Sequence, residues 1–79
     1  MTSARVKLTF PADLVREPIM AELVRRFEVT PNIRRADVRD EVGWIVCEMS
    51  GSVEGLTSAL EWLEDVGVEV DRLDQPLEG

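Results

Sequence analysis

Residues 32–51 read NIRRADVRDEVGWIVCEMSG, and this stretch has the form of a β-hairpin. The segment Asp40-Glu41-Val42-Gly43 has turn chemistry, and it separates a first arm, NIRRADVRD, from a second arm, GWIVCEMSG. Two runs of strand-forming residues on either side of such a turn pair with each other. We therefore expect two antiparallel strands here, at the centre of the chain.

The two arms differ in how their side chains alternate. In the first arm Ala36 and Val38 share a face of the strand, but Ile33 is out of phase with them, which predicts a bulge or a late strand start. In the second arm both faces carry apolar side chains, with Ile45, Cys47 and Met49 on one face and Trp44, Val46 and Glu48 on the other. The second arm is therefore at least partly covered on both sides.

The N-terminal part predicts a strand followed by a helix. Residues 5–10, RVKLTF, alternate between apolar and polar side chains as a half-buried strand does. Pro18 stands where the first turn of a helix tolerates a missing N–H. An amphipathic helix of roughly ten residues follows, and its apolar stripe is Ile19, Met20, Leu23, Val24 and Phe27. Pro31 is expected to close the turn after this helix.

The C-terminal part predicts a second helix followed by a last strand. Ser52 is positioned to cap a second helix, whose apolar stripe is Leu56, Ala59, Leu60 and Leu63. Gly67 is placed to end this helix in a left-handed conformation. Val68 and Val70 then alternate with charged residues as a last strand.

The predicted order of elements is strand, helix, strand, strand, helix, strand. This is the split βαβ or ferredoxin-like pattern of the α+β class. Right-handed crossovers place both helices on one face of a four-stranded antiparallel sheet in the order 4-1-3-2. The second and fourth strands are then the edges. The apolar set Val6, Leu8, Phe10, Ile45, Cys47 and Met49 is expected to face the helices, while Lys7, Thr9, Trp44, Val46 and Glu48 lie on the open face.

Length and composition predict one small globular domain. The chain has 79 residues, 44% of them hydrophobic and 32% charged, and residues 1–79 are expected to form a single domain with structure over about residues 5–73. The segment MTSARVKLTF lacks the pattern of a signal peptide, and no stretch is apolar enough for a membrane span. We expect a cytoplasmic protein without membrane insertion.

The residue inventory argues against an enzyme. The chain has no histidine and a single cysteine, which excludes histidine-based catalytic arrangements and the common zinc sites. The five glycines stand apart, so no phosphate loop is present. A formal net charge of −7 opposes binding to nucleic acid, whose affinity comes from neutralised phosphates. We expect a binding or interaction module with no cofactor and no metal.

The charge is unevenly distributed along the chain. Residues 1–39 carry eight basic and five acidic side chains, whereas residues 40–79 carry one basic and eleven acidic side chains. In the predicted sheet one edge holds Arg34, Arg35 and Arg39, and the opposite edge holds Glu69, Asp71 and Asp74. Charged edges prevent aggregation. Alternatively, they form a contact between two copies, or Arg25, Arg26, Arg34 and Arg35 hold an anionic group.

Trp44 and Val46 are candidate interface residues. Tryptophan is enriched among interface anchors, and Val46 widens the apolar patch that Trp44 begins on the open face. With Arg35 and Arg39 of the neighbouring strand they form the candidate interface. Single exposed apolar residues are also ordinary, and Trp62 has a weaker claim as an off-stripe helix residue.

Cys47 falls on the helix-facing side of its strand, where a small apolar residue is wanted. Buried thiols at such positions are usually inert. We expect a structural role for Cys47.

The segments placed above resemble the NIL domain family over about residues 5–73. The elements that carry the resemblance are the LTF strand end, Glu17-Pro18-Ile19 at the helix start, Asn32-Ile33 with Ala36, and residues 43–51 ending in EMSG. Their order and spacing carry the likeness, and no single element is diagnostic.

The resemblance implies a ferredoxin-like fold and a regulatory or docking role. NIL domains occur as the C-terminal regulatory domain of methionine-importer ATPases, where bound L-methionine inhibits transport, and fused to iron–sulfur ferredoxin modules in sulfur metabolism. The chain has neither the phosphate loop of an ATPase nor the four cysteines of a cluster. The sensing or docking part is what the resemblance carries over.

The resemblance also suggests where a ligand binds. Asn32 matches the motif asparagine of the family and is a candidate to supply amide hydrogen bonds, with Ile33 and Ala36 lining an apolar slot. Alternatively, Asn32 is a turn residue after Pro31 that bonds to its own backbone. Arg34 stands where an apolar residue is expected, and it either clamps a carboxylate or fills the pocket.

We therefore predict a regulatory domain that binds L-methionine or a related sulfur amino acid and self-associates through its sheet edges or its open face. The alternative is a docking subunit for a sulfur-metabolism or iron–sulfur enzyme, with no ligand of its own.

Overall fold

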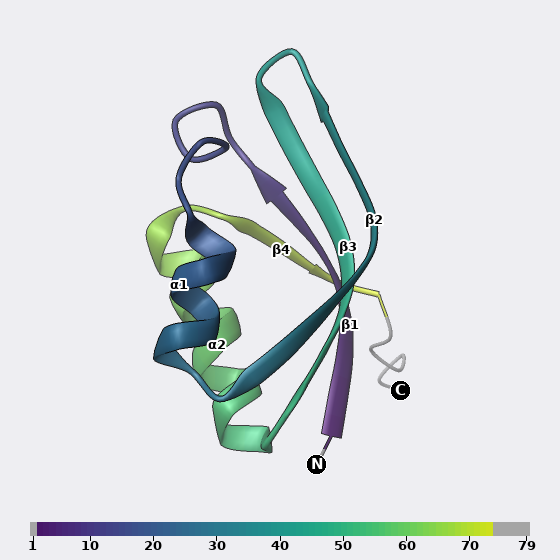
Figure 1. Ribbon diagram of the computed structural model, residues 1–79, viewed down its shortest axis with the longest axis vertical. Helices are drawn as coiled ribbons and strands as arrows, with labels where there is room; N and C mark the ends of the chain where they lie inside the picture. Colours follow the sequence, from purple (N-terminus) through teal and green to yellow (C-terminus); the bar gives the residue numbers. More distant parts are fainter. Residues whose placement is uncertain (1, 74–79) are drawn as a thin grey trace, which may run out of the picture.

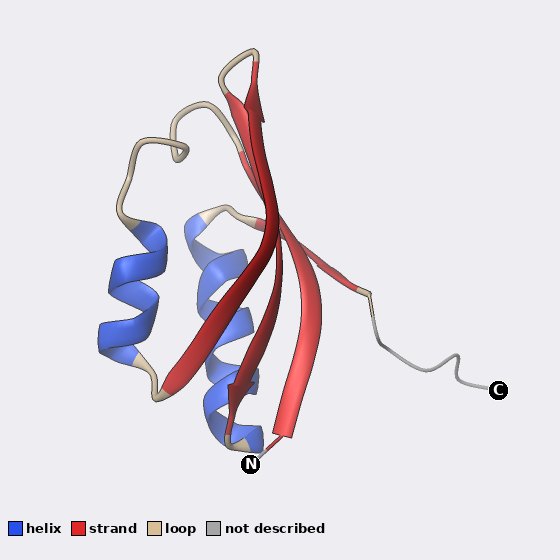
Figure 2. Cartoon of the chain, turned by 45° about the vertical axis from the view of Figure 1, so that its right-hand side comes forward, coloured by secondary structure: helices blue, strands red, loops and turns tan. Residues whose placement is uncertain are grey.

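Two helices cover one face of a four-stranded antiparallel sheet. The computed structural model describes residues 2–73. Along the chain the elements are β1 (Thr2–Phe10), α1 (Ile19–Arg26), β2 (Val29–Arg39), β3 (Val42–Gly51), α2 (Val53–Val66) and β4 (Glu69–Arg72). The sheet order is β2-β3-β1-β4, with both helices on the same side (Figures 1 and 2). The predicted ferredoxin-like order is confirmed, while β1 begins at Thr2 rather than at Arg5.

The β2–β3 hairpin contains the predicted bulge. Ile33 pairs with Cys47, but the next partner of β3, Val46, pairs with Arg35, so Arg34 is the extra residue. The irregularity brings Ile33 and Ala36 onto the same, helix-facing side of the sheet, although their numbers differ by three and regular alternation would place them on opposite faces. The strand itself begins earlier than its alternation suggested, at Val29.

The prediction that Pro31 closes a turn is wrong. Pro31 lies inside β2, where it pairs with Met49. A proline has no N–H to donate, and it is tolerated here because β2 is an outer strand with one side unpaired. The connection between α1 and β2 is accordingly only two residues long.

The hairpin turn is tighter than the sequence indicated. Asp40 and Glu41 alone separate the two strands, and both have positive φ, 53° and 66°. Positive φ at both central residues is the signature of a type I′ turn, whose twist matches that of the strands. Asn-Gly is the usual solution at these positions, so the chain accepts strain at this turn.

The ends of the helices follow local chemistry. Ser52 caps α2, since its Oγ accepts a hydrogen bond of 2.9 Å from the amide of Gly55. Gly67 ends α2 with a φ of 111°, a conformation that costs glycine little. Pro18 is the N-cap residue of α1, one position before the first helical turn, and makes no side-chain cap.

The core lies between the helices and the sheet. Its buried members are Ala4, Val6, Leu8, Phe10, Ile19, Leu23, Val29, Cys47, Met49, Leu56, Ala59, Leu63 and Val68. Ile45, expected to face the helices, packs against this core while partly exposed. Trp62 also packs against it, with its ring centroid 5.8 Å from that of Phe27 and 5.4 Å from the guanidinium of Arg26. This packing accounts for Trp62 without an interface.

The two outer strands carry opposite charge, as predicted. β2 holds Arg34, Arg35 and Arg39, and β4 holds Glu69 and Asp71. Asp74 lies outside the described residues. Neither helix among the described residues is long and apolar enough to cross a membrane.

The strained turn gives a stability test. Replacing Glu41 by glycine is expected to raise the free energy of unfolding by about 0.5–1 kcal/mol, because glycine adopts positive φ without steric cost. The measurement is urea denaturation followed by circular dichroism. The matched control is Glu61→Gly in α2, which removes the same charge but lowers the stability by about 1 kcal/mol. A loss of stability in both variants would contradict the strain at Glu41.

Candidate ligand-binding site

All four predicted ligand residues lie exposed on the outer strand. Asn32 pairs with Glu48 on the face of the sheet that the helices leave open, which we call the open face. Ile33 points to the helix side but remains 52% exposed. Arg34 is the extra residue of the bulge. Asn32 and Ile33 therefore lie on opposite faces of the sheet, both on its outer strand β2.

Arg34 is tied to the neighbouring strand. Its Nη2 lies 2.9 Å from Oε1 of Glu48, and both side chains are substantially exposed. An ion pair at such an exposed position contributes about 0–1 kcal/mol. The pair orients Arg34 over the open face, and its strength is small enough for a competing anion to displace Glu48.

Ala36, the fourth predicted residue, lines a cleft of about 320 Å³ between the start of α1 and the β2–β3 hairpin. Most of its wall is apolar, and the side chains that shape it include Phe10, Val15, Met20, Ala36, Val38 and Ile45. Glu17 and Asp37 also belong to the lining, but Asp37 pairs with Trp44 on the open face, where its carboxylate lies beside Arg39. Small-molecule sites typically combine such an apolar wall with a few polar groups.

The cleft results from unequal lengths of helix and strand. The eight residues of α1 span about 12 Å at 1.5 Å per residue. The eleven residues of β2 span about 36 Å at 3.3 Å per residue. Because α1 covers only part of β2, the helix-facing side chains near the hairpin lack a cover, and Val38 is 63% exposed.

Gly43 leaves space within this cleft. A Cβ at this position would lie 2.9 Å from Cγ2 of Val15 and 3.3 Å from Cγ2 of Val38. Any side chain on Gly43 would therefore push these two valines apart or fill the space between them. The sequence marked Gly43 as a turn residue, whereas the structure places it in β3, opposite both Phe10 and Val38.

Sequence reasoning found Ala36 and missed the rest of the cleft. Val38 carried a signal, since it was predicted to share a face with Ala36. Val15 lies in the loop between β1 and α1, where no periodicity exists to mark it. Met20 was assigned to the core stripe of α1, and it is half-buried at the side of the cleft.

The four candidate interface residues gather on the open face. Trp44 and Val46 project there from β3, and Arg35 and Arg39 flank them on β2. Nζ of Lys7 lies 5.3 Å from the ring centroid of Trp44, and Nε of Arg39 lies 2.8 Å from Oδ2 of Asp37. Trp44 is therefore partly covered by the lysine side chain, and the face mixes apolar and charged groups.

Within residues 2–73, no three histidine, cysteine or acidic side chains lie together in a group that could hold a metal ion. The Cys47 side chain is fully buried, and this burial raises the pKa of its thiol. A raised pKa lowers the fraction of the reactive thiolate. The expected structural role of Cys47 agrees with its place in the core.

Comparison with known proteins gives a family match and several relatives. A model of the NIL domain matches residues 4–72. The methionine import ATP-binding protein MetN of Helicobacter pylori strain J99 is 30% identical over 71 residues, which cover 85% of this chain and 22% of that protein. The MetN protein of Francisella tularensis strain SCHU S4 is 37% identical over 71 residues, covering 82% of this chain and 20% of that protein. The chain thus spans about a fifth of the length of these relatives.

Two further matches cover most of the matched protein as well as most of this chain. An uncharacterized protein of Synechococcus elongatus is 29% identical over 73 residues, 89% of this chain and 90% of that protein. The crystal structure of the C-terminal domain of an ABC transporter ATP-binding protein from Enterococcus faecalis superposes with a TM-score of 0.81 at 21% identity, covering 92% of this chain and 86% of that one. At that identity the structural likeness supports the fold alone.

The burial of Cys47 is testable by thiol labelling. At mildly alkaline pH, Ellman's reagent is expected to modify the native chain about tenfold or more slowly than the chain in guanidinium chloride, because the reaction needs local opening of the core. The control is a Ser58→Cys variant in a Cys47→Ala background, whose exposed helical thiol should react at the same rate in both conditions. Equal rates for native and denatured Cys47 would show that the thiol is accessible.

Proposed function

The chain belongs to the NIL domain family, and from this premise we propose that it is a regulatory domain that binds L-methionine or a related sulfur amino acid, rather than an enzyme. Its curated relatives include methionine import ATP-binding proteins, of which it matches about a fifth. The observation that carries the proposal is the apolar cleft beside β2, whose wall includes Ala36 of the family motif.

The cleft meets two of the three demands of a free amino acid with a thioether side chain. Its apolar wall, with Met20 and Val38, accepts the side chain, and the carboxylate of Glu17 is an acceptor for an ammonium group. The third demand is a donor for the ligand carboxylate. Asn32 and Arg34, farther along β2, are the candidate donors, and because they face the other side of the sheet in the same chain, they would come from a second copy.

We propose further that a second copy of the chain completes the site. Asn32, Ile33 and Arg34 lie on an unpaired outer strand, and such a flat edge cannot enclose the 70–90% of a ligand's surface that binding sites usually bury. A second β2 strand along this edge would cover Ile33 and Val38, which are 52% and 63% exposed. It would also pair the backbone groups that an outer strand leaves open.

The open face supports the alternative of a docking subunit. Trp44, Val46, Arg35 and Arg39 form one continuous surface that needs no ligand to bind a partner protein. A sulfur-metabolism or iron–sulfur enzyme is the partner class that the family suggests. In either case the proposed location is the cytoplasm.

A titration with L-methionine separates the two functions. The amide resonances of Met20, Ala36 and Val38 are expected to shift and saturate. Ala36→Leu, which fills the cleft, should abolish these shifts, and Asn32→Ala should weaken binding by about tenfold through the loss of its hydrogen bonds. Ala12→Leu adds the same volume outside the cleft and should bind normally. No saturable shift up to millimolar ligand would contradict the sensor and favour the docking subunit.

Self-association through the β2 edge is a separate prediction. Sedimentation at physiological salt, which screens the repulsion between the two arginine-bearing strands, should show a dimer, and Ile33→Lys should reduce it to a monomer, because a lysine on an outer strand opposes edge pairing. Val53→Lys is the control, since Val53 is a 65% exposed residue at the start of α2. A dimer that resists Ile33→Lys would exclude this edge, and a mass unchanged by salt would exclude an electrostatic contact.

A further inference from the structure

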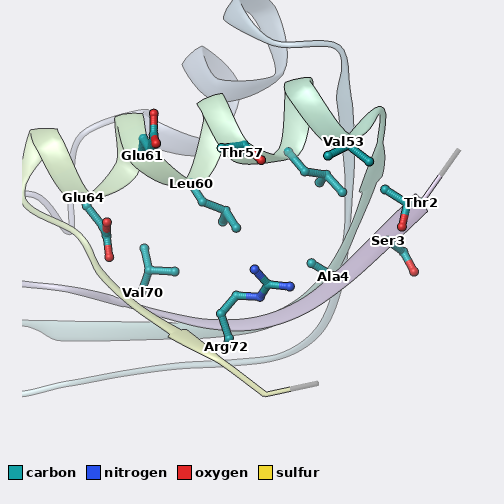
Figure 3. A pocket seen from close by; sticks show the side chains of 11 residues that line it. Thr2, Ser3, Ala4, Val53, Thr57, Leu60, Glu61, Glu64, Val70 and Arg72 are labelled. Carbon is teal, nitrogen blue, oxygen red and sulfur yellow. The ribbon is translucent and has the colours of Figure 1, made fainter. Parts of the chain in front are cut away.

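A second groove lies on the other flank of the molecule. It has a volume of about 410 Å³ and runs between α2 and the helix-facing side of β1 and β4 (Figure 3). Ala4, Leu56, Leu60 and Val70 give it an apolar lining. It shares no residue with the cleft beside β2.

Arg72 is the unusual residue of this groove. It is the only basic residue after Arg39 in the sequence, and it pairs with Val6, whose side chain faces the helices and is fully buried. Paired residues share a face of the sheet, so Arg72 occupies a position where an apolar residue would extend the core. Figure 3 shows its guanidinium group directed from β4 toward α2.

Arg72 already has a partner within the molecule. A guanidinium group carries five N–H donors in a fork that matches a carboxylate. It can therefore hold a bound carboxylate while it keeps an internal contact.

The opposite wall of the groove is acidic and hydroxylated. Glu64 of α2 extends toward β4 near Val70, and Thr57 lies about two turns earlier on the same helix (Figure 3). Glu61 completes this rim. The groove thus presents a cation from the strand, a carboxylate from the helix and apolar side chains between them.

We propose that this groove binds an aliphatic α-amino acid in its zwitterionic form. Arg72 holds the ligand carboxylate, Glu64 accepts hydrogen bonds from the ammonium group, and the side chain lies on Leu56 and Leu60. A ligand with only a negative charge would face two glutamates, and an apolar ligand would make no charge-assisted hydrogen bond to Arg72 or Glu64. The volume lies within the usual range of small-molecule sites, about 300–1,000 Å³.

The experiment is an amide-shift titration of the full chain with L-leucine, which lacks sulfur. Saturable shifts are expected at residues 57–64 and 70–72. Two analogues that each lack one charge, 3-methylbutylamine and 4-methylpentanoate, should bind about tenfold more weakly or worse.

Matched variants identify the contacts. Arg72→Gln and Glu64→Gln are expected to weaken L-leucine binding by about tenfold each, and Arg72→Lys should restore only part of the loss because lysine lacks the planar fork. Arg16→Gln and Asp65→Asn remove the same charges outside the groove and should bind normally. Circular dichroism of each variant checks that it is folded.

Each outcome decides the proposal. Shifts in the groove that depend on Arg72 and Glu64 support it. An absence of saturable shifts there, binding of either analogue as tight as that of L-leucine, or insensitivity to Arg72→Gln overturns it. Shifts confined to Met20, Ala36 and Val38 would overturn this second site and leave the proposed function in place, because the two sites share no residue.

Discussion

The antiparallel pairing of β1 with β3 is the contact on which the rest of the molecule depends. Val6 lies opposite Cys47 and Ala4 opposite Met49, and all four side chains are buried. These strands form the surface on which both helices bury their apolar stripes. In a chain of 79 residues the fraction of surface buried on folding is small, so the core has no second region that could compensate for a defect here. The outer strands and loops are therefore the parts free to vary for binding.

Local chemistry explains which features the sequence predicted correctly. The cap at Ser52, the left-handed end at Gly67 and the bulge after Ile33 each depend on a few neighbouring residues. The topology followed because short connections leave few ways to order the elements. The prediction for Pro31 was wrong because a proline interrupts a strand or is accepted in it according to whether that strand lies at the edge of the sheet. No local sequence pattern shows which strands are edges.

The candidate site was less predictable because its cleft depends on distances between elements. Ala36 was found through the family motif, but the cleft exists because α1 is shorter than β2 and because Gly43 carries no side chain. Val15 reaches this cleft from a loop without periodicity. Helix length, strand length and loop path combine only in three dimensions, so the sequence pattern showed one wall of the cleft and not the others.

Local cations, rather than the net charge, decide where the carboxylate of a ligand can bind. The chain carries a formal charge of −7, but charges more than about 8 Å apart in water are largely screened at physiological ionic strength. The bulge in β2 places Arg34 and Arg35 beside each other at one edge of the sheet. At the other edge, Arg72 lies in the acidic half of the sequence and faces the helices. An amino acid has a carboxylate that needs such a cation and an ammonium group that the surrounding acidic side chains favour. The charge asymmetry of the sequence therefore suits zwitterionic ligands at both edges better than simple anions.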